Sequence, residues 1–436
     1  MGNAAKIRAI LLLGLLFFLS QTSIFSQNNS PRVLPGVSPV NSLTMKVAVI
    51  GPGDQLYFWW GHIGLVIEDN IKGRIRFYDW GVFSFENENF FVNFAFGRLL
   101  YRCMVSQAEA YYQSYIRTNR DITLYTLDLP AEKINEVLRF AENNVLPENC
   151  DYFYHHFKDN CATRVRDILD MALDGQLKAK FGQAPGRYTL RQHVRRHTWH
   201  NQFFDWILNF WMGQDIDRPI TVWEEMFLPS EIGLRILDFR YTDENGKEKA
   251  LVSSVETMNR AIKRPAVLGV PRLQWPRELI FSLTLSIVFL SSFLLWGRLK
   301  NYKIFLALFQ SFLGLFFGIA GSMLFFLTFF TDHDYTYNNS NIFYVNPLFL
   351  AVIPLALIFA FANNEKKRFI SARVLRIFWI CIFLGGIMTM VLKLFPGFYQ
   401  QNQVTQALVM PIALTMIFVT SQYAKITKKR RCCPKN

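Results

Sequence analysis

The residues with the clearest chemical potential are a histidine and a cysteine that lie ninety-nine positions apart, His62 and Cys161. His62 lies in a strand-like run over residues 60–67, whereas Asn160 and Cys161 open a helix-like run that continues over residues 162–173. Amide dipoles at a helix N-terminus and a nearby imidazole both favour the thiolate form of a cysteine. The pattern therefore predicts a thiol nucleophile with His62 as its base, and hence covalent acyl chemistry.

A β-hairpin is expected to bring a carboxylate beside His62. Residues 63–67 and 74–80 alternate as two strands do, and residues 69–72 form a turn signal between them. With the turn centred at its midpoint, His62 faces Asp79 directly, where a carboxylate would orient the imidazole. Taken alone, His62 is also typical of a structural histidine on a half-buried strand, and Asp79 of a strand-end carboxylate.

The residues just before Cys161 contain helix caps and two further histidines. Asp159 or Asn160 can cap the following helix, whose apolar residues recur at helical spacing. Cys161 then lies in the first turn, where its backbone N–H can donate to a tetrahedral oxyanion. His155 and His156 are alternative bases, although adjacent residues cannot both face one thiol. Alone, a cysteine is more often a small buried apolar residue.

A metal site is not expected. Three histidines share helical spacing, but arginines lie beside and between them and would repel a cation. The same arginines suit phosphate or lipid headgroups, or a solvated basic face. The histidines are His193, His197 and His200, and the arginines are Arg191, Arg195 and Arg196.

The C-terminal part of this 436-residue chain has the composition of a membrane domain. Five apolar runs are long enough, or nearly so, to cross a bilayer as helices. An aromatic content of 16% agrees with a chain that lies largely in or against lipid. The runs cover residues 279–296, 304–330, 343–362, 374–392 and 404–419.

Basic residues alternate between the connections of these runs. They follow the first run, the third run and the last, whereas residues 331–344 after the second run and 395–403 after the fourth contain no lysine or arginine. The positive-inside rule predicts an N-terminal domain outside the cytoplasm and a cytoplasmic C-terminus. Because much of the net charge of +14 lies beside these apolar runs, nucleic acid is not expected as a partner.

The predicted organisation has four parts. Residues 1–26 have a basic start, a short apolar core and small residues before a polar stretch, which predicts a signal peptide, with an uncleaved anchor as the alternative. An extracytoplasmic thiol domain over residues 27–275 and a five-helix transmembrane domain over 276–424 follow. A basic cytoplasmic tail over 425–436 ends the chain.

Three cysteines lie outside under this topology, namely Cys103, Cys150 and Cys161. An odd number allows one disulfide, Cys103 to Cys150, and leaves Cys161 as the free thiol. The alternative is that all three are reduced and that two are merely buried.

Three short motifs contain the predicted site: Gly61-His62-Ile63-Gly64-Leu65, Tyr78-Asp79-Trp80-Gly81-Val82-Phe83-Ser84-Phe85 and Asp159-Asn160-Cys161-Ala162-Thr163-Arg164. In order and spacing they resemble a circularly permuted NlpC/P60 or papain-like domain, in which the histidine precedes the cysteine. More closely, the whole chain resembles the Lnb-type lipoprotein N-acyltransferases. The resemblance implies an α+β thiol domain followed by an α-helical membrane domain of five transmembrane helices.

The polar loop over residues 331–341 is a further part of this resemblance. It resembles the histidine and asparagine motif between the second and third spans of the family, and it lies on the same side of the membrane as Cys161. A plain connecting loop is the alternative. The resemblance implies substrate-binding roles for His333, Asn339, Asn341, Asn160 and Arg164.

The implied activity is transfer of an acyl chain from a membrane phospholipid, through a Cys161 thioester, to the α-amine of the lipid-modified N-terminal cysteine of lipoproteins. Cys161, His62 and Asp79 would be catalytic, and neither a metal nor another cofactor is implied. The implied partners are a phospholipid donor and diacylglyceryl lipoproteins, and the implied location is the bacterial cytoplasmic membrane with a periplasmic catalytic domain. Two alternatives remain: a membrane-tethered cysteine amidase or peptidase acting on the cell wall, and a non-enzymatic envelope assembly factor.

Overall fold

The computed structural model describes residues 43–432 apart from 84–88, 268, 298 and 300–301, with the backbone alone from residue 423 onward. The predicted signal peptide over residues 1–26 therefore lies outside the described residues, as does the end of the predicted basic tail.

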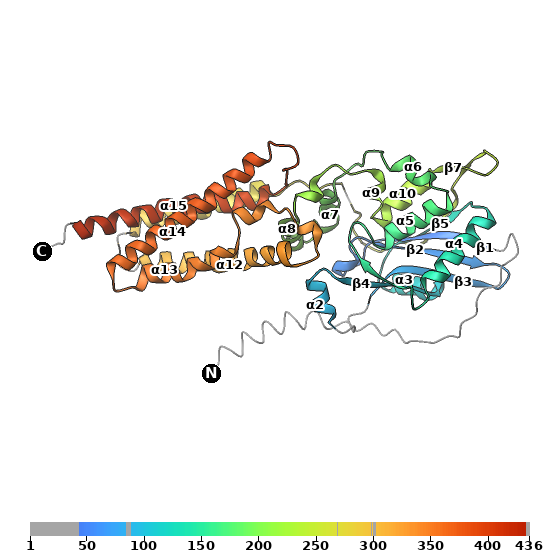
Figure 1. Ribbon diagram of the computed structural model, residues 1–436, viewed down its shortest axis with the longest axis horizontal. Helices are drawn as coiled ribbons and strands as arrows, with labels where there is room; N and C mark the ends of the chain where they lie inside the picture. Colours follow the sequence, from blue (N-terminus) through green and yellow to red (C-terminus); the bar gives the residue numbers. More distant parts are fainter. Residues whose placement is uncertain (1–42, 84–88, 268, 298, 300–301, 433–436) are drawn as a thin grey trace. The chain divides into compact units, whose positions relative to one another are not determined.

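A seven-stranded antiparallel sheet forms the centre of the N-terminal domain (Figure 1). The strand order is β6-β4-β3-β2-β1-β5-β9, so the two strands of the predicted hairpin, β2 and β3, lie in the middle of the sheet together with β1. A separate short hairpin pairs β7 with β8. The strands are β1 Leu43–Ile50, β2 His62–Asp69, β3 Arg74–Val82, β4 Leu99–Gln107, β5 Ile122–Leu127, β6 Asp151–Tyr154, β7 Arg240–Thr242, β8 Glu248–Ala250 and β9 Val252–Asn259.

The register between β2 and β3 differs by two residues from the prediction. Asp69 pairs with Arg74, which leaves a four-residue loop over residues 70–73 in place of the shorter turn. The Asp69 carboxylate accepts hydrogen bonds from two backbone N–H groups in this loop, and Gly73 supplies a left-handed conformation with φ of 61°. The predicted direct facing of His62 and Asp79 is therefore wrong. Because side chains alternate with a period of two, both still lie on the same face of the sheet.

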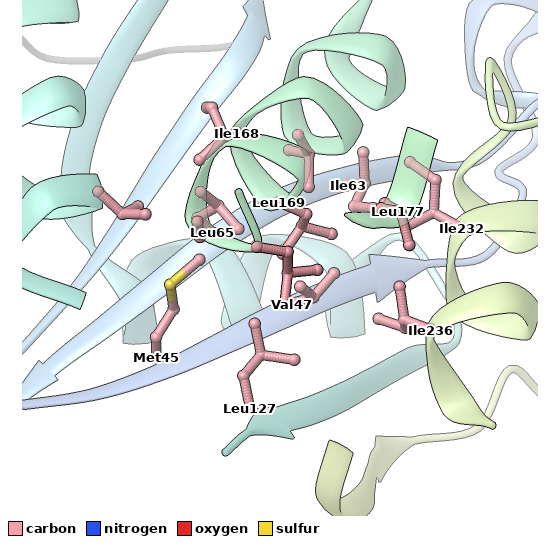
Figure 2. Packing of buried hydrophobic residues seen from close by; sticks show 14 of the residues in the cluster. Met45, Val47, Ile63, Leu65, Leu127, Ile168, Leu169, Leu177, Ile232 and Ile236 are labelled. Atoms are coloured by element: carbon pink, nitrogen blue, oxygen red, sulfur yellow. The ribbon is translucent and has the colours of Figure 1, made fainter. Parts of the chain in front are cut away.

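Helices cover both faces of the sheet. On one face α4, α5 and α10 pack over apolar side chains of β1 and β2, which form the core shown in Figure 2. On the opposite face α3 packs over a smaller cluster around Phe77 and Val66. Alternate residues of β1 enter the two cores, as strand geometry requires. The helices are α3 Ala108–Arg117, α4 Ala131–Asn144, α5 Cys161–Ala172 and α10 Pro229–Leu237.

Several shorter helices complete the N-terminal domain. They include α2, which follows β3 in sequence, and the consecutive helices α7 and α8. Their bounds are α2 Phe90–Ala95, α6 Gln176–Phe181, α7 Leu190–Thr198, α8 Gln202–Trp211 and α9 Val222–Glu225.

Among the described residues, five helical segments are long and apolar enough to cross a membrane, which agrees with the five predicted runs. The fifth helix packs on the first and the fourth, and the second packs on the third. Their shared core is apolar and includes the fully buried Trp379 and Leu306. The segments are α11 Trp275–Trp296, α12 Tyr302–Phe330, Ser340–Phe361 (which ends in α13 Val352–Phe361), α14 Glu365–Leu392 and α15 Gln403–Cys432, of which residues 403–422 are the spanning part.

The cysteines of the N-terminal domain are free thiols. Cys103, Cys150 and Cys161 are all buried, and none is in a disulfide. Cys103 donates its backbone N–H to the carbonyl of Cys150 over 2.8 Å, so the two residues lie on adjoining chain segments. Of the two predicted alternatives, the structure has the reduced one.

Candidate functional site

His62 is the first residue of β2 and its imidazole is held by Asp79. Nε2 of His62 donates to Oδ1 of Asp79 over 2.9 Å, and the same oxygen accepts the backbone N–H of Gly81 over 2.7 Å. The Asp79 carboxylate is buried, so both bonds are shielded from water. A carboxylate in this position fixes both the ring orientation and the tautomer, which leaves Nδ1 of His62 for a second partner.

The imidazole lies over Gly81, and the absence of a side chain there makes room for it. A Cβ atom built on Gly81 would lie 2.5 Å from Cε1 of His62 and 3.2 Å from its Nδ1. Non-bonded carbon atoms in folded proteins do not approach that closely. The observed position of the imidazole therefore depends on glycine at position 81.

Cys161 is the first residue of α5, as predicted, and it is 8% exposed. Asn160 is the N-cap, with its side-chain oxygen accepting the N–H groups of Ala162 and Thr163, each over 2.9 Å. The Thr163 hydroxyl in turn accepts the backbone N–H of Asn160 over 2.7 Å, which completes a capping box. Among the described residues, no group accepts a hydrogen bond from the backbone N–H of Cys161.

The side chains of His62 and Cys161 meet. Burial alone would lower the pKa of His62, but the charges of Asp79 and Cys161, and hydrogen bonds to both, raise that pKa to about 10. His62 is therefore an imidazolium at neutral pH, held between a carboxylate and the sulfur. Such a pair is the arrangement that activates a cysteine nucleophile.

Tyrosine rings line the surroundings of the thiol. Burial, and then the charge of Cys161, raise the pKa of Tyr101, Tyr152 and Tyr154, so these hydroxyls stay protonated. The rings of Tyr101 and Tyr154 stack at 4.1 Å. The hydroxyl of Tyr152 donates to the backbone carbonyl of Trp80. Cys161 thus lies in a largely aromatic environment.

The two alternative bases have other environments. His155 donates from Nε2 to Oδ1 of Asp334 over 2.7 Å, while its Nδ1 accepts two backbone N–H groups, so both of its nitrogens are occupied. Burial, and then the charges of His333 and His155, lower the pKa of His156 to about 3. His156 is therefore neutral at physiological pH, and it is His62 that hydrogen bonds to Cys161.

The loop between the second and third spans contacts the thiol domain. Asp334 binds His155 and also Lys158, three residues before the nucleophile. His333 donates from Nε2 to the backbone carbonyl of Phe94 over 3.0 Å. These contacts attach the predicted loop to the segments that flank the site, so it is more than a plain connection.

The predicted substrate-binding asparagines of this loop bind α8. Asn339 donates to the carbonyls of Phe210 and Trp211 over 2.9 Å, and Asn341 donates to Phe210 over 2.9 Å. Both side chains are buried. Their polar groups are therefore satisfied by the protein, and a role in binding substrate stays a prediction.

The two predicted binding residues next to the nucleophile are also engaged. Asn160 caps α5 and donates to the carbonyls of His156 and Phe227. Arg164 forms a two-point ion pair with Asp159 at 2.7 and 2.9 Å. Its guanidinium lies 3.8 Å from the ring centre of Tyr152. Both side chains position the first turn of α5, and their contact with substrate stays a prediction.

The histidines on and after α7 are structural. His193 pairs with buried Glu225 at 3.1 Å, and His197 donates to the carbonyl of Trp59 over 2.8 Å. No group of three or more metal-ligating side chains occurs in the part of the chain that the structure describes. Arg191 fits neither of the two alternatives, a headgroup surface or a solvated basic face, because it is fully buried and binds Asp217 and three backbone carbonyls.

Sequence reasoning missed Gly81 as part of the site, and also the pairing of His155 with Asp334. Gly81 lies within a quoted motif, and the correct register would have put it opposite His62. No local signal joins His155 to Asp334, since they are far apart in the chain and come from different domains.

Comparison with known sequence families gives two matches. Residues 36–196 match the family described as the Lnb N-terminal periplasmic domain. Residues 275–431 match the family described as the Lnb transmembrane domain. The chain matches no curated protein and no solved structure. The first match contains His62, Asp79 and Cys161, and the second contains the five spans and the loop over 331–341.

Proposed function

Because the chain belongs to the Lnb family, we propose that it is a lipoprotein N-acyltransferase in which Cys161 carries the acyl group. The family makes it a lipoprotein-processing enzyme of the inner membrane, with a periplasmic N-terminal domain and several membrane spans. The observation that carries the proposal is the contact of His62, held by Asp79, with a cysteine at a helix N-terminus.

In the first half-reaction the Cys161 thiolate attacks an ester carbonyl of a phospholipid. The carbon–sulfur bond forms and the ester carbon–oxygen bond breaks, which leaves an acyl-thioester and a lysophospholipid alkoxide. The His62 imidazolium gives its proton to that alkoxide, so lysophospholipid leaves as a neutral alcohol. The raised pKa of His62 supports this role, since the ring holds its proton until the leaving group needs it.

In the second half-reaction a lipoprotein α-amine attacks the thioester in its neutral form. His62, now deprotonated, takes a proton from the attacking nitrogen as the amide bond forms and the carbon–sulfur bond breaks. The products are an N-acylated lipoprotein and the original thiolate and imidazolium pair. Two separate half-reactions predict ping-pong kinetics.

Both half-reactions pass through a tetrahedral oxyanion. The backbone N–H of Cys161 is available at the N-terminus of α5, where the helix dipole also favours negative charge. The tyrosine rings around the sulfur support the exclusion of water, which would otherwise hydrolyse the thioester.

The finer description of the fold is part of this proposal. The order of histidine on β2 before cysteine on α5 supports a circularly permuted NlpC/P60 or papain-like domain. We propose the domain limits 27–275, 276–424 and 425–436, with a cytoplasmic C-terminus. The basic connections after the first and third spans support that orientation.

A gene-removal experiment tests the proposed function. Lipoproteins from cells that lack the gene should lose the mass of one fatty acyl chain from their N-terminal cysteine, and the wild-type gene should restore it. The measurement is mass spectrometry of the N-terminal lipopeptides. Identical lipopeptide masses with and without the gene would overturn the proposal and favour a cell-wall amidase or an assembly factor.

The pH profile tests the role of Asp79. In wild-type protein, formation of the acyl-enzyme should fall at high pH as His62 loses its proton near pH 10. Asp79→Asn removes the carboxylate charge that raises the pKa of His62, so this alkaline limb should move to lower pH. The rate of acyl-enzyme formation, followed by intact-protein mass between pH 6 and 11, gives the alkaline limb of the wild-type protein and that of Asp79→Asn. An unchanged alkaline limb would contradict the assigned coupling.

A further inference from the structure

The surface of α2 is unusually apolar for a helix outside the spans. Its six residues, Phe90–Ala95, contain no charged side chain. Phe91, Val92 and Phe94 are 56%, 55% and 50% exposed. Three adjacent, exposed large side chains of this kind are costly in water and typical of a surface that meets lipid or another protein.

The structure attaches α2 to the outer end of the second span. The backbone N–H of Asp332 donates to the carbonyl of Phe96 over 2.8 Å, and the ring of Phe96 contacts that of Phe326 at 5.5 Å. At the same end of α12, Phe329 and Phe330 are 60% and 59% exposed. Because α12 crosses the membrane, its outer end lies at the lipid surface, and α2 adjoins that end.

A row of aromatic rings leads from α2 toward the nucleophile. Successive ring centres are 6.1, 6.2, 5.0 and 4.1 Å apart. The four rings after the first are half-buried. The last ring belongs to a tyrosine whose pKa is raised by burial and by the charge of Cys161, so the row ends within electrostatic range of the sulfur. This aromatic row consists of Phe94, Phe90, Phe83, Tyr101 and Tyr154.

We propose that α2 lies in the outer leaflet of the membrane and that the aromatic row guides the donor acyl chain from that leaflet to Cys161. This inference rests on the proposed function and assigns a binding path to its donor. A fatty chain fits the row because the rings offer apolar contact without charged groups, whereas a peptide would leave its backbone polar groups without partners there. The continuity of α2 with the lipid-facing end of α12 favours a membrane over a protein partner.

Photo-crosslinking tests the position of α2 independently of any activity. The full-length protein carrying Phe91→p-benzoylphenylalanine is reconstituted in vesicles of phosphatidylethanolamine and phosphatidylglycerol and irradiated. We expect a phospholipid adduct at position 91, identified by mass spectrometry. The matched control is Ile71→p-benzoylphenylalanine, since Ile71 is 65% exposed in the loop between β2 and β3. Equal lipid adducts at both positions, or none at position 91, would overturn the placement of α2.

Acylation rates with two esters test the aromatic row. The measure is the rate of Cys161 acylation by vesicle phospholipid with palmitoyl chains, divided by the rate with p-nitrophenyl acetate. Phe90→Ser should lower this ratio at least tenfold, because acetate has no chain to guide. Phe140→Ser, on the exposed side of α4, is the matched control and should leave the ratio unchanged.

The outcomes separate the inference from the proposed function. An unchanged ratio in Phe90→Ser, with normal acylation in wild type, would overturn the acyl path and leave the proposed function intact. Wild-type protein that forms no acyl-enzyme with either ester would overturn the proposed function and the path together. The contact of α2 with lipid is then still decided by the crosslinking result.

Discussion

Replacing Cys161 with serine should abolish the acyl-enzyme and N-acylation of lipoproteins, with a loss of about 10³-fold or more in rate. Serine is close in size to cysteine, so the buried first turn of α5 should keep its cap and its packing. Because the serine hydroxyl has a far higher intrinsic pKa than a thiol, a single imidazolium cannot keep that hydroxyl ionised as an alkoxide. A loss of about 10³-fold corresponds to roughly 4 kcal/mol of activation free energy.

Two readouts measure this effect. Incubation with phospholipid vesicles should add one acyl mass to wild-type protein, and hydroxylamine should remove it because thioesters are labile to that nucleophile. Cys150→Ser is the matched control, since Cys150 is a second buried thiol of the domain and its replacement can still donate to the carbonyl of Pro147. Acyl mass retained in Cys161→Ser but lost in Cys150→Ser would move the nucleophile away from Cys161.

The parts of the site that could be predicted from sequence are those set by local rules. An N-cap followed by an apolar stripe is a local pattern, so the start of α5 at Cys161 agrees with the prediction. Strand alternation has a period of two, so the shared face of His62 and Asp79 survived an error of two residues in the register. The five spans followed from hydrophobic length alone.

The remaining features depend on contacts that no local pattern encodes. The register of β2 against β3 depended on the left-handed Gly73 and the Asp69 side chain, which lengthen the loop. The pairing of His155 with Asp334 joins two domains. Asn339 and Asn341 match a sequence motif, but the contact of their amides with α8 is visible only in the folded structure. Tertiary contacts of this kind are decided by packing over the whole chain.

The second large effect concerns the imidazole, which should be sensitive both to removal and, to a smaller extent, to displacement. His62→Ala removes the proton donor and acceptor of both half-reactions, so acyl-enzyme formation should fall by about 10³-fold. His200→Ala is the control, because His200 lies outside the site against the ring of Trp59. The rate of acylation by phospholipid vesicles, with thermal unfolding as a check of folding, measures both variants. Activity within tenfold of wild type in His62→Ala would exclude His62 as the general acid and base.

Gly81→Ala separates the position of the ring from its presence. The new methyl group would lie 2.5 Å from Cε1 of His62, so the ring must tilt away and lengthen its 2.9 Å bond to Asp79. A displacement of about 1 Å in a catalytic group can cost about 10²-fold in rate, and we expect a loss of that size here. Gly269→Ala is the matched control, since the nearest atom to its new Cβ would be 4.0 Å away. A normal rate in Gly81→Ala would mean that the imidazole acts from another position. If the rate falls and the alkaline limb of its pH profile moves to lower pH, as expected for Asp79→Asn, the loss arises from the broken contact with Asp79.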